Sequence, residues 1–146
     1  HPDHAKILYQ LLEERDPVAN ISHCVMPTWE EHLAFVASEP FEAWYLLTEV
    51  GCISWPPVVH RPGAVIDPAS RAVGSIYLTR ASEIGVSIFK IEQGVGWGEA
   101  AVRILMREPG PRRYLANVAP GNEPSRKMFE KLEFKLIQVT YSLEAE

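Results

Sequence analysis

Residues 93–98, with the sequence Gln-Gly-Val-Gly-Trp-Gly, are the part of the chain whose composition points most directly to a bound ligand. Glycine allows the backbone to turn tightly and to approach a ligand closely. The segment leads into a stretch of helical periodicity, and the unpaired amides of a first helical turn, together with the helix dipole, attract anions. The pattern predicts a phosphate-binding loop. The alternative is a glycine-rich connection that binds nothing.

Two common nucleotide-binding patterns do not match this loop. The dinucleotide fingerprint needs a third glycine where this chain has Glu99, and an acidic residue about 20 positions further on. The later region offers Asn117 and Asn122 instead. A P-loop needs Gly-Lys followed by Ser or Thr, and no such run follows. A nicotinamide-dependent oxidoreductase is therefore disfavoured.

The loop resembles the pyrophosphate loop of the GNAT superfamily of acetyl-CoA-dependent N-acetyltransferases, which reads Q/R-x-x-G-x-G/A. Gln93, Gly96 and Gly98 occupy its defined positions. Residues 128–134 are similar to the second cofactor segment of that family, and the resemblance covers residues 42–143. It implies a GNAT-like acyl-CoA N-acyltransferase fold of the mixed α/β (α+β) class. The central sheet would be largely antiparallel, with one parallel strand–helix–strand crossover at the cofactor site.

The resemblance also implies acetyl-CoA as co-substrate and no metal. The pyrophosphate would be held by the backbone amides of Gly94, Val95, Gly96, Trp97 and Gly98. The backbone of Ile91 and Glu92 would pair with the pantetheine arm as an added strand does. The other cofactor-binding candidates are Gln93, Asn117, Asn122, Ser125 and Arg126. For Asn122, helix capping is an equally good interpretation, and for Arg126 or Lys127 alone a solvated helix face is the better one.

Glu83 is the first candidate for a general base. An alkyl ammonium group with a pKa near 10 is about 99.9% protonated at pH 7, so a base or a desolvating site must remove a proton before the amine can attack. In many members of the family a glutamate on the strand before the loop does this through water, and Glu83 stands at the start of that strand. Glu92 is the second candidate. An exposed turn carboxylate is the alternative interpretation of Glu83.

Phe129 stands where the family usually has the tyrosine that protonates the departing thiolate. Either Tyr141 on the last predicted strand takes its place, or solvent does, because a thiol is acidic enough to leave without a dedicated acid. A tyrosine in an apolar stripe is more often part of the core. Glu133 replaces the usual helix-ending glycine, which costs stability if that residue is left-handed.

The surrounding pattern predicts the elements that must position these residues. Apolar periodicity, with a capping box at Thr28, predicts helices over 4–16, 29–38, 97–107 and from Asn122 onward. Alternation and β-rich composition predict strands over 43–48, 73–79, 84–91, 114–119 and 135–143. The proline-rich segment 51–72 is expected to be a long loop, either a lid over the acceptor cleft or a disordered insertion. No helix fits between the second and third strands, so they should form a hairpin.

Composition describes an ordinary soluble domain. The chain has 146 residues, a net charge of −5 and 47% apolar residues, which predicts one domain spanning 1–146. The acidic balance argues against nucleic-acid binding, and there is neither a membrane-spanning run nor a signal-peptide pattern. Only Cys24 and Cys52 are present, too few for a disulfide framework or a zinc site, so a cytoplasmic location is expected. The strand 135–143 could pair two copies into a homodimer.

The favoured function is transfer of an acetyl group from acetyl-CoA to a primary amine by direct attack in a ternary complex. A small-molecule acceptor, such as an amino sugar or a polyamine, is favoured over a protein. The alternative is a non-catalytic acyl-CoA-binding domain with a sensing or structural role.

Overall fold

The computed structural model describes residues 2–14, 26–49, 51–54, 71–107 and 109–145. Its helices are α1 (Pro2–Glu14), α2 (Trp29–Ala37), α3 (Trp97–Arg107) and α4 (Glu123–Lys131), with a 3₁₀ turn η2 at Lys90–Glu92. Its strands are β1 (Ala43–Thr48), β2 (Gly51–Ser54), β3 (Ala72–Leu78), β4 (Glu83–Ile88) and β5 (Leu115–Ala116). The prediction of a mixed α/β domain is confirmed.

The strands form a five-stranded sheet in the order β2-β1-β3-β4-β5. All neighbours are antiparallel except β4 and β5, which are parallel and connected through α3. The β3–β4 hairpin closes through Thr79, whose amide donates to the Glu83 carbonyl at 2.9 Å, with Ser82 left-handed at φ 66°. The predicted hairpin followed by a parallel crossover is therefore confirmed.

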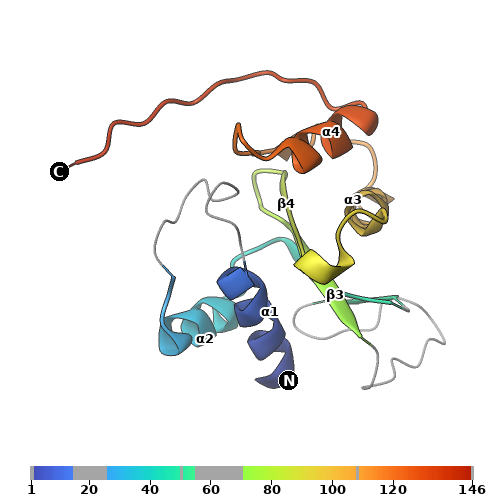
Figure 1. Ribbon diagram of the computed structural model, residues 1–146. Helices are drawn as coiled ribbons and strands as arrows, with labels where there is room; N and C mark the ends of the chain where they lie inside the picture. The colour runs from blue at the N-terminus through green and yellow to red at the C-terminus, as the bar shows by residue number, and fades with distance from the viewer. Residues whose placement is uncertain (1, 15–25, 50, 55–70, 108, 146) are drawn as a thin grey trace.

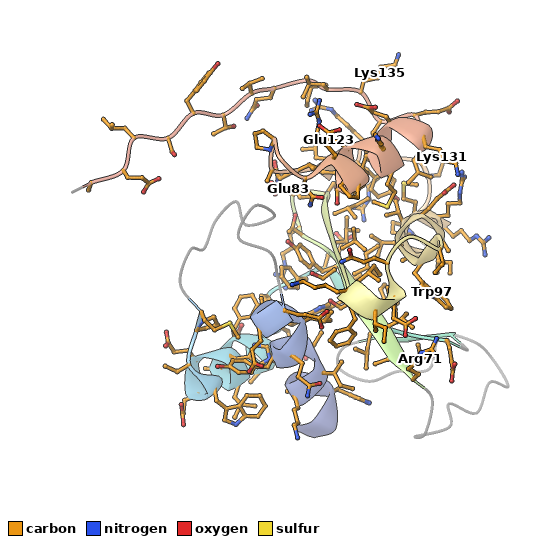
Figure 2. The ribbon with its side chains drawn as sticks, viewed as in Figure 1. Arg71, Glu83, Trp97, Glu123, Lys131 and Lys135 are labelled. Carbon is orange, nitrogen blue, oxygen red and sulfur yellow. The ribbon has the colours of Figure 1, made fainter. Side chains whose placement is uncertain are left out.

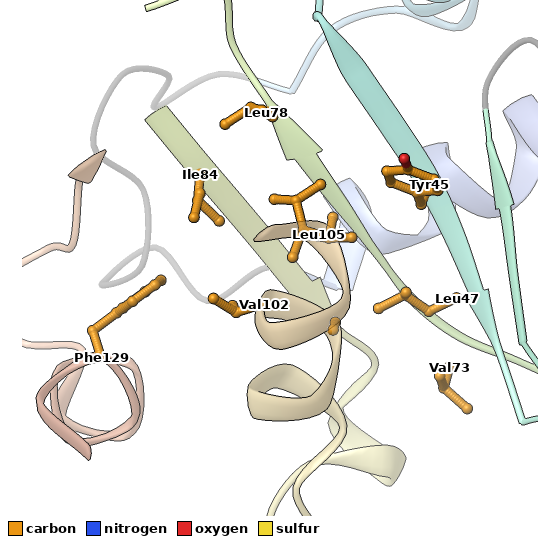
Figure 3. Packing of buried hydrophobic residues seen from close by; sticks show 10 residues of the cluster. Tyr45, Leu47, Val73, Leu78, Ile84, Val102, Leu105 and Phe129 are labelled. Carbon is orange, nitrogen blue, oxygen red and sulfur yellow. The ribbon is translucent and has the colours of Figure 1, made fainter. Parts of the chain in front are cut away.

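Helices cover both faces of the sheet (Figure 1). On one face, Val102 and Leu105 of α3 and Phe129 of α4 pack against β1, β3 and β4 (Figure 3). On the other, Leu8 and Leu11 of α1 and Val36 of α2 pack against β1, where they form a second apolar cluster with Trp44 and Leu46. Fully burying a large aliphatic side chain stabilises the fold by about 1.5–3 kcal/mol, so each helix layer is held chiefly by these contacts.

The parallel pair β4–β5 is very short. Only Glu83 and Leu115, then Ile84 and Ala116, are paired, and β5 ends there. Beyond Ile84, β4 continues to Ile88 along β3 alone. Within the described part of the chain, the backbone of β4 from Gly85 onward therefore has no strand on its β5 side.

Two expectations about strands are wrong. Residues 51–54, expected within the proline-rich loop, form β2, because the turn after Thr48 lets the chain pair back along β1 from Gly51 to Ser54. The rest of that loop, 55–70, lies outside the described residues. The predicted strand 135–143 carries no regular structure, and Figure 1 shows this segment running away from the sheet. Alternation alone does not make a strand without a neighbour to satisfy its backbone hydrogen bonds.

Two further strands are shorter than predicted. The strand predicted over 84–91 ends at Ile88 and turns into η2, where the amide of Glu92 donates to the Phe89 carbonyl at 2.8 Å. The strand predicted over 114–119 pairs only at Leu115–Ala116. The short β5 reflects the separation of the β4 and β5 backbones after two paired residues, whereas β4 ends where its pairing with β3 ends, at Ile88.

The four predicted helices are present, and the expected N-caps Thr28 of α2 and Asn122 of α4 are observed. The Thr28 side chain accepts from the Glu31 amide at 3.1 Å, while Glu31 accepts from the Thr28 amide at 3.1 Å. In the part of the chain that the structure describes, no helix combines the length and apolarity needed to cross a membrane.

Candidate functional site

A cleft of about 1150 Å³ opens where β4 and β5 separate. Its floor is β4, and one end is the glycine loop at 93–98. Part of the segment 117–131 lines one side, and residues of α1 and α2 with the aromatic residues beneath them line the other. The cleft thus exists because a parallel strand pair stops after two residues.

The glycine loop has the backbone geometry expected of a phosphate site. Gly94 and Gly96 have φ angles of 86° and 96°, which other residues adopt only with strain. A Cβ atom at either position would meet no atom within 4 Å, so the space over the loop is open. The loop leads directly into α3 at Trp97, and amides of a first helical turn have no partner within their helix. This end of the cleft can hold an anion.

Lysine side chains stand beside this end. Lys127 and Lys131 of α4 both line the cleft. Lys131 Nζ lies 3.1 Å from Glu99 Oε2, and Arg103 Nη2 lies 3.1 Å from Glu99 Oε1. Hydrogen bonds from Lys131 and then Arg103 lower the pKa of Glu99 below its usual value. The one carboxylate in the first turn of α3 is therefore paired with cations.

Glu83 and Asn117, predicted separately, meet at the other end of the cleft. Asn117 Nδ2 donates to Glu83 Oε2 at 2.8 Å, across the start of the β4–β5 pair. Glu83 is itself fixed by the hairpin, because its amide donates to Thr79 Oγ1 at 3.0 Å. Figure 2 shows Glu83 beneath α4, while Trp97 lies further along at the start of α3. The site has a carboxylate at one end and a helix N-terminus at the other.

The next three candidates occupy the start of α4. Asn122 is the N-cap, and its Oδ1 accepts from the Ser125 amide at 3.4 Å, so its capping interpretation is confirmed. Asn122 and Ser125 also line the cleft. Arg126 does not line it: its guanidinium donates to Glu123 at 2.8 Å and to the Pro120 carbonyl. Lys127 is the cation that α4 presents to the cleft at this point.

Ile91 and Glu92 lie in the η2 turn, not in an extended strand. Ile91 is 90% exposed, and Glu92 pairs with Arg71 at 2.8 Å. Val95 is 75% exposed, whereas Gln93 donates from Nε2 to the Ile88 carbonyl at 2.9 Å and ties the loop to the end of β4. Strand-like pairing with a ligand is therefore available along the free edge of β4 and not at residues 91 and 92.

Tyr141 is not brought to the cleft. It is 91% exposed on the segment that runs away from the sheet, and it does not line the site. Phe129 is 7% exposed and packs edge-to-face on Phe134 with ring centroids 5.1 Å apart. Neither residue offers a proton to a group bound along β4.

A group of aromatic residues that was not predicted from the sequence lines the cleft on the side of α2. Phe41 stacks on Tyr77 with centroids 4.0 Å apart, and Trp44 meets Phe41 edge-on at 4.9 Å. The Tyr77 ring lies over Gly85, where a Cβ atom would come within 2.0 Å of the ring. A glycine inside a predicted strand was the available signal, since it marks a close approach.

No model of a known protein family matches the chain, and no curated protein matches it. In the described ranges, no three histidine, cysteine, aspartate or glutamate side chains gather as metal ligands would. The functional argument therefore rests on the residues of the cleft.

Proposed function

We propose that the chain is a GNAT-type N-acetyltransferase, which transfers the acetyl group of acetyl-CoA to a primary amine. The observation that carries the proposal is the early end of the β4–β5 pairing. It leaves a cleft that has an anion-binding loop at one end, a free strand edge along its floor and the Glu83–Asn117 pair at the other end. Acetyl-CoA has a charged end, an extended arm and a reactive thioester in that order.

The loop residues fit the phosphate end. The open space over Gly94 and Gly96 admits a pyrophosphate, and the amides at the start of α3 can donate to it. Lys127, which also lines the cleft, supplies positive charge, while Lys131 is paired with Glu99. A strand rises about 3.3 Å per residue, so β4 spans about 17 Å from Glu83 to Ile88, and its free edge from Gly85 to Ile88 makes up about 10 Å of that length. An extended pantetheine arm can hydrogen-bond along this free edge as an added strand does.

Acetyl-CoA supplies the acetyl group as an activated thioester, and the residues of the chain handle position and protons. Glu83 accepts a proton from the attacking amine, directly or through water, while Asn117 keeps its carboxylate oriented toward the cleft. Free amides along β4 can donate to the carbonyl oxygen as negative charge develops on it. The nitrogen–carbon bond forms, the carbon–sulfur bond breaks, and the thiolate takes a proton from solvent, since a thiol pKa near 8.5 makes a dedicated acid dispensable.

Glu83→Gln tests the proposal, because glutamine keeps the size and the contact with Asn117 but cannot accept the proton. We expect kcat/KM for amine acetylation to fall by ~10²-fold near pH 7, and the deficit to shrink toward pH 10, where about half of the amine is already neutral. Release of the free thiol measures turnover. Coenzyme A affinity, measured by calorimetry, should stay unchanged.

Glu130→Gln is the matched control, because Glu130 is an exposed glutamate of α4 outside the cleft. Coenzyme A binding without turnover of any amine would favour the non-catalytic acyl-CoA-binding alternative. Failure of coenzyme A to bind, or to raise the unfolding temperature, would overturn both assignments.

A further inference from the structure

The segment 135–144, here called the tail, keeps the alternation of a strand but has no strand beside it in the described part of the chain. Figure 1 shows it extended and running away from the sheet. Its even positions from Gln138 to Glu144 are polar. Its odd positions are apolar and between 63% and 99% exposed: Ile137, Val139, Tyr141 and Leu143. An exposed apolar face and an unpaired extended backbone both need a further chain segment to cover them.

The edge of the sheet at β5 offers such a segment a place. β5 is the last strand in the sheet order, so none of the strands that the structure describes pairs with its outer side. Tyr114, Ala116 and Val118 are partly buried there and pack against the core cluster formed with α3 and α4. These three residues alternate and contact the same core, so a strand added at this edge can extend one apolar face.

The alternation of the two segments restricts how they can pair. Residues directly opposite each other in an antiparallel pair project from the same face. With Tyr141 opposite Ala116, the apolar positions of the tail join the apolar face at β5. The same register places Val139 opposite Val118 and Leu143 opposite Tyr114. A shift by one residue would turn the polar positions of the tail toward the core instead.

Charge favours the antiparallel direction. In the register above, Glu144 lies opposite Arg113, and both residues are exposed in the single chain. A parallel arrangement would instead bring Lys135 toward Arg112 and Arg113. Opposite charges across a strand pair stabilise it and like charges destabilise it, so the antiparallel pair is the complementary one.

Chain direction points to the β5 of another molecule. In this chain β5 leads into α4, and α4 leads into the tail. A strand that returns beside its predecessor through a helix runs parallel to it, which is the direction that brings like charges together. The antiparallel pair therefore needs a second copy. Two copies related by a two-fold axis can each supply one tail and receive the other.

We propose that the chain forms a homodimer by exchange of tails, in which the tail of each copy adds as an antiparallel strand to the outer edge of β5 in the other copy. Each sheet gains a sixth strand, and the apolar face of each tail packs at the border of the core beside Tyr114 and Ala116. The proposal is independent of the proposed function, because amine turnover plays no part in its tests.

The first test is the mass of the full chain, measured by light scattering up to about 100 μM, well above a micromolar Kd. We expect a dimer. Tyr141→Asp should raise the dimer Kd by at least ~10-fold, because a charge would enter the apolar face. Gln138→Asp is the matched control: it makes the same charge change at a polar position and should leave the Kd unchanged.

Tyr141 is almost fully exposed in the single chain, so its substitution leaves the fold of each copy intact. A monomer at every concentration, or a dimer that Tyr141→Asp does not weaken, would overturn the proposal.

Cross-linking tests the register and the exchange. Leu115 and Ser142 lie opposite each other, so Leu115→Cys with Ser142→Cys should give a covalent dimer under mild oxidation. Cys24 and Cys52 are replaced by serine in these variants. Leu115→Cys with Gln138→Cys is the control, because Gln138 lies four positions further along, about 13 Å away and beyond the reach of a disulfide.

Equal cross-linking of the two cysteine pairs would overturn the register. A disulfide that forms within one chain would show that the tail pairs with its own β5, and would overturn the exchange.

Charge reversal tests the direction of the pairing. Glu144→Arg and Arg113→Glu should each raise the dimer Kd several-fold, and the two together should restore it, because the opposite charges face each other again. Without that recovery, the antiparallel arrangement would be wrong.

Discussion

At the C-terminal end of α4, a left-handed residue makes the choice of amino acid important for stability. At the end of α4, the Phe134 amide donates to the Phe129 carbonyl and the Glu133 amide to the Glu130 carbonyl, both at 2.9 Å. These two bonds make a Schellman motif, and Phe134 packs on Phe129 as that motif favours. Glu133 has the left-handed φ of 70° that the motif requires, so the condition under which a non-glycine residue costs stability there is met.

Glu133→Gly should therefore stabilise the protein by about 1 kcal/mol, because glycine adopts this conformation without a Cβ clash. Denaturant unfolding followed by circular dichroism measures the change. Glu130→Gly is the opposite control: Glu130 lies inside the helix, where glycine should cost about 1 kcal/mol. Equal effects at the two positions would contradict this account of Glu133.

At the scale of elements, helix starts that are encoded by neighbouring residues were predicted correctly, whereas strands that need a pairing partner distant in sequence were not. The capping box at Thr28 and the cap at Asn122 are written in neighbouring residues, and both helices begin where expected. Whether a segment forms a strand depends on a neighbouring strand to pair with. The strand at 51–54, which pairs with β1, was therefore not predicted, and the strand predicted at 135–143 is not observed. The pairing of Glu83 with Asn117 likewise needed the sheet order, because 34 positions separate them.

The loop–helix element at 93–107 makes a prediction about coenzyme A. Gly96→Asp should weaken binding by at least ~10²-fold, because a carboxylate would face the phosphate groups across the open space over the loop. Gly110→Asp is the matched control: Gly110 is also left-handed with open space at its Cβ position, so the backbone strain is shared, but it lies outside the cleft. Calorimetry on both variants decides, and equal loss of binding would refute the anion site.

At the scale of the whole molecule, the sheet separates two helix layers (Figure 1), and residues of both layers line the cleft. The α3–α4 layer provides the anion end, and the α1–α2 layer packs on the aromatic residues Phe41, Trp44 and Tyr77 that line the other side. His32 links α2 to α1 by donating from Nε2 to the Ala5 carbonyl at 2.8 Å, and it is 2% exposed. Because a carbonyl oxygen can only accept, the neutral ring carries its proton on Nε2.

Burial lowers the pKa of His32 below its ordinary 6.5, with the bond to Ala5 opposing in part. The unfolded chain therefore binds a proton on this ring at a higher pH than the folded chain does, so stability is full above about pH 6.5 and falls as pH decreases toward the folded value. Each unit by which folding lowers the pKa of His32 removes about 1.4 kcal/mol of unfolding free energy once the pH is below both the folded and the unfolded pKa.

Unfolding free energies at pH 7.5 and 5.5 should show this loss in the wild type and a smaller one in His32→Gln, which keeps a donor for Ala5 but does not titrate. The carboxylates with lowered pKa values, Glu31, Glu42 and Glu99, titrate below this window and leave the comparison intact. Equal losses in both proteins would show that His32 is not the residue through which acid loosens the α1–α2 layer.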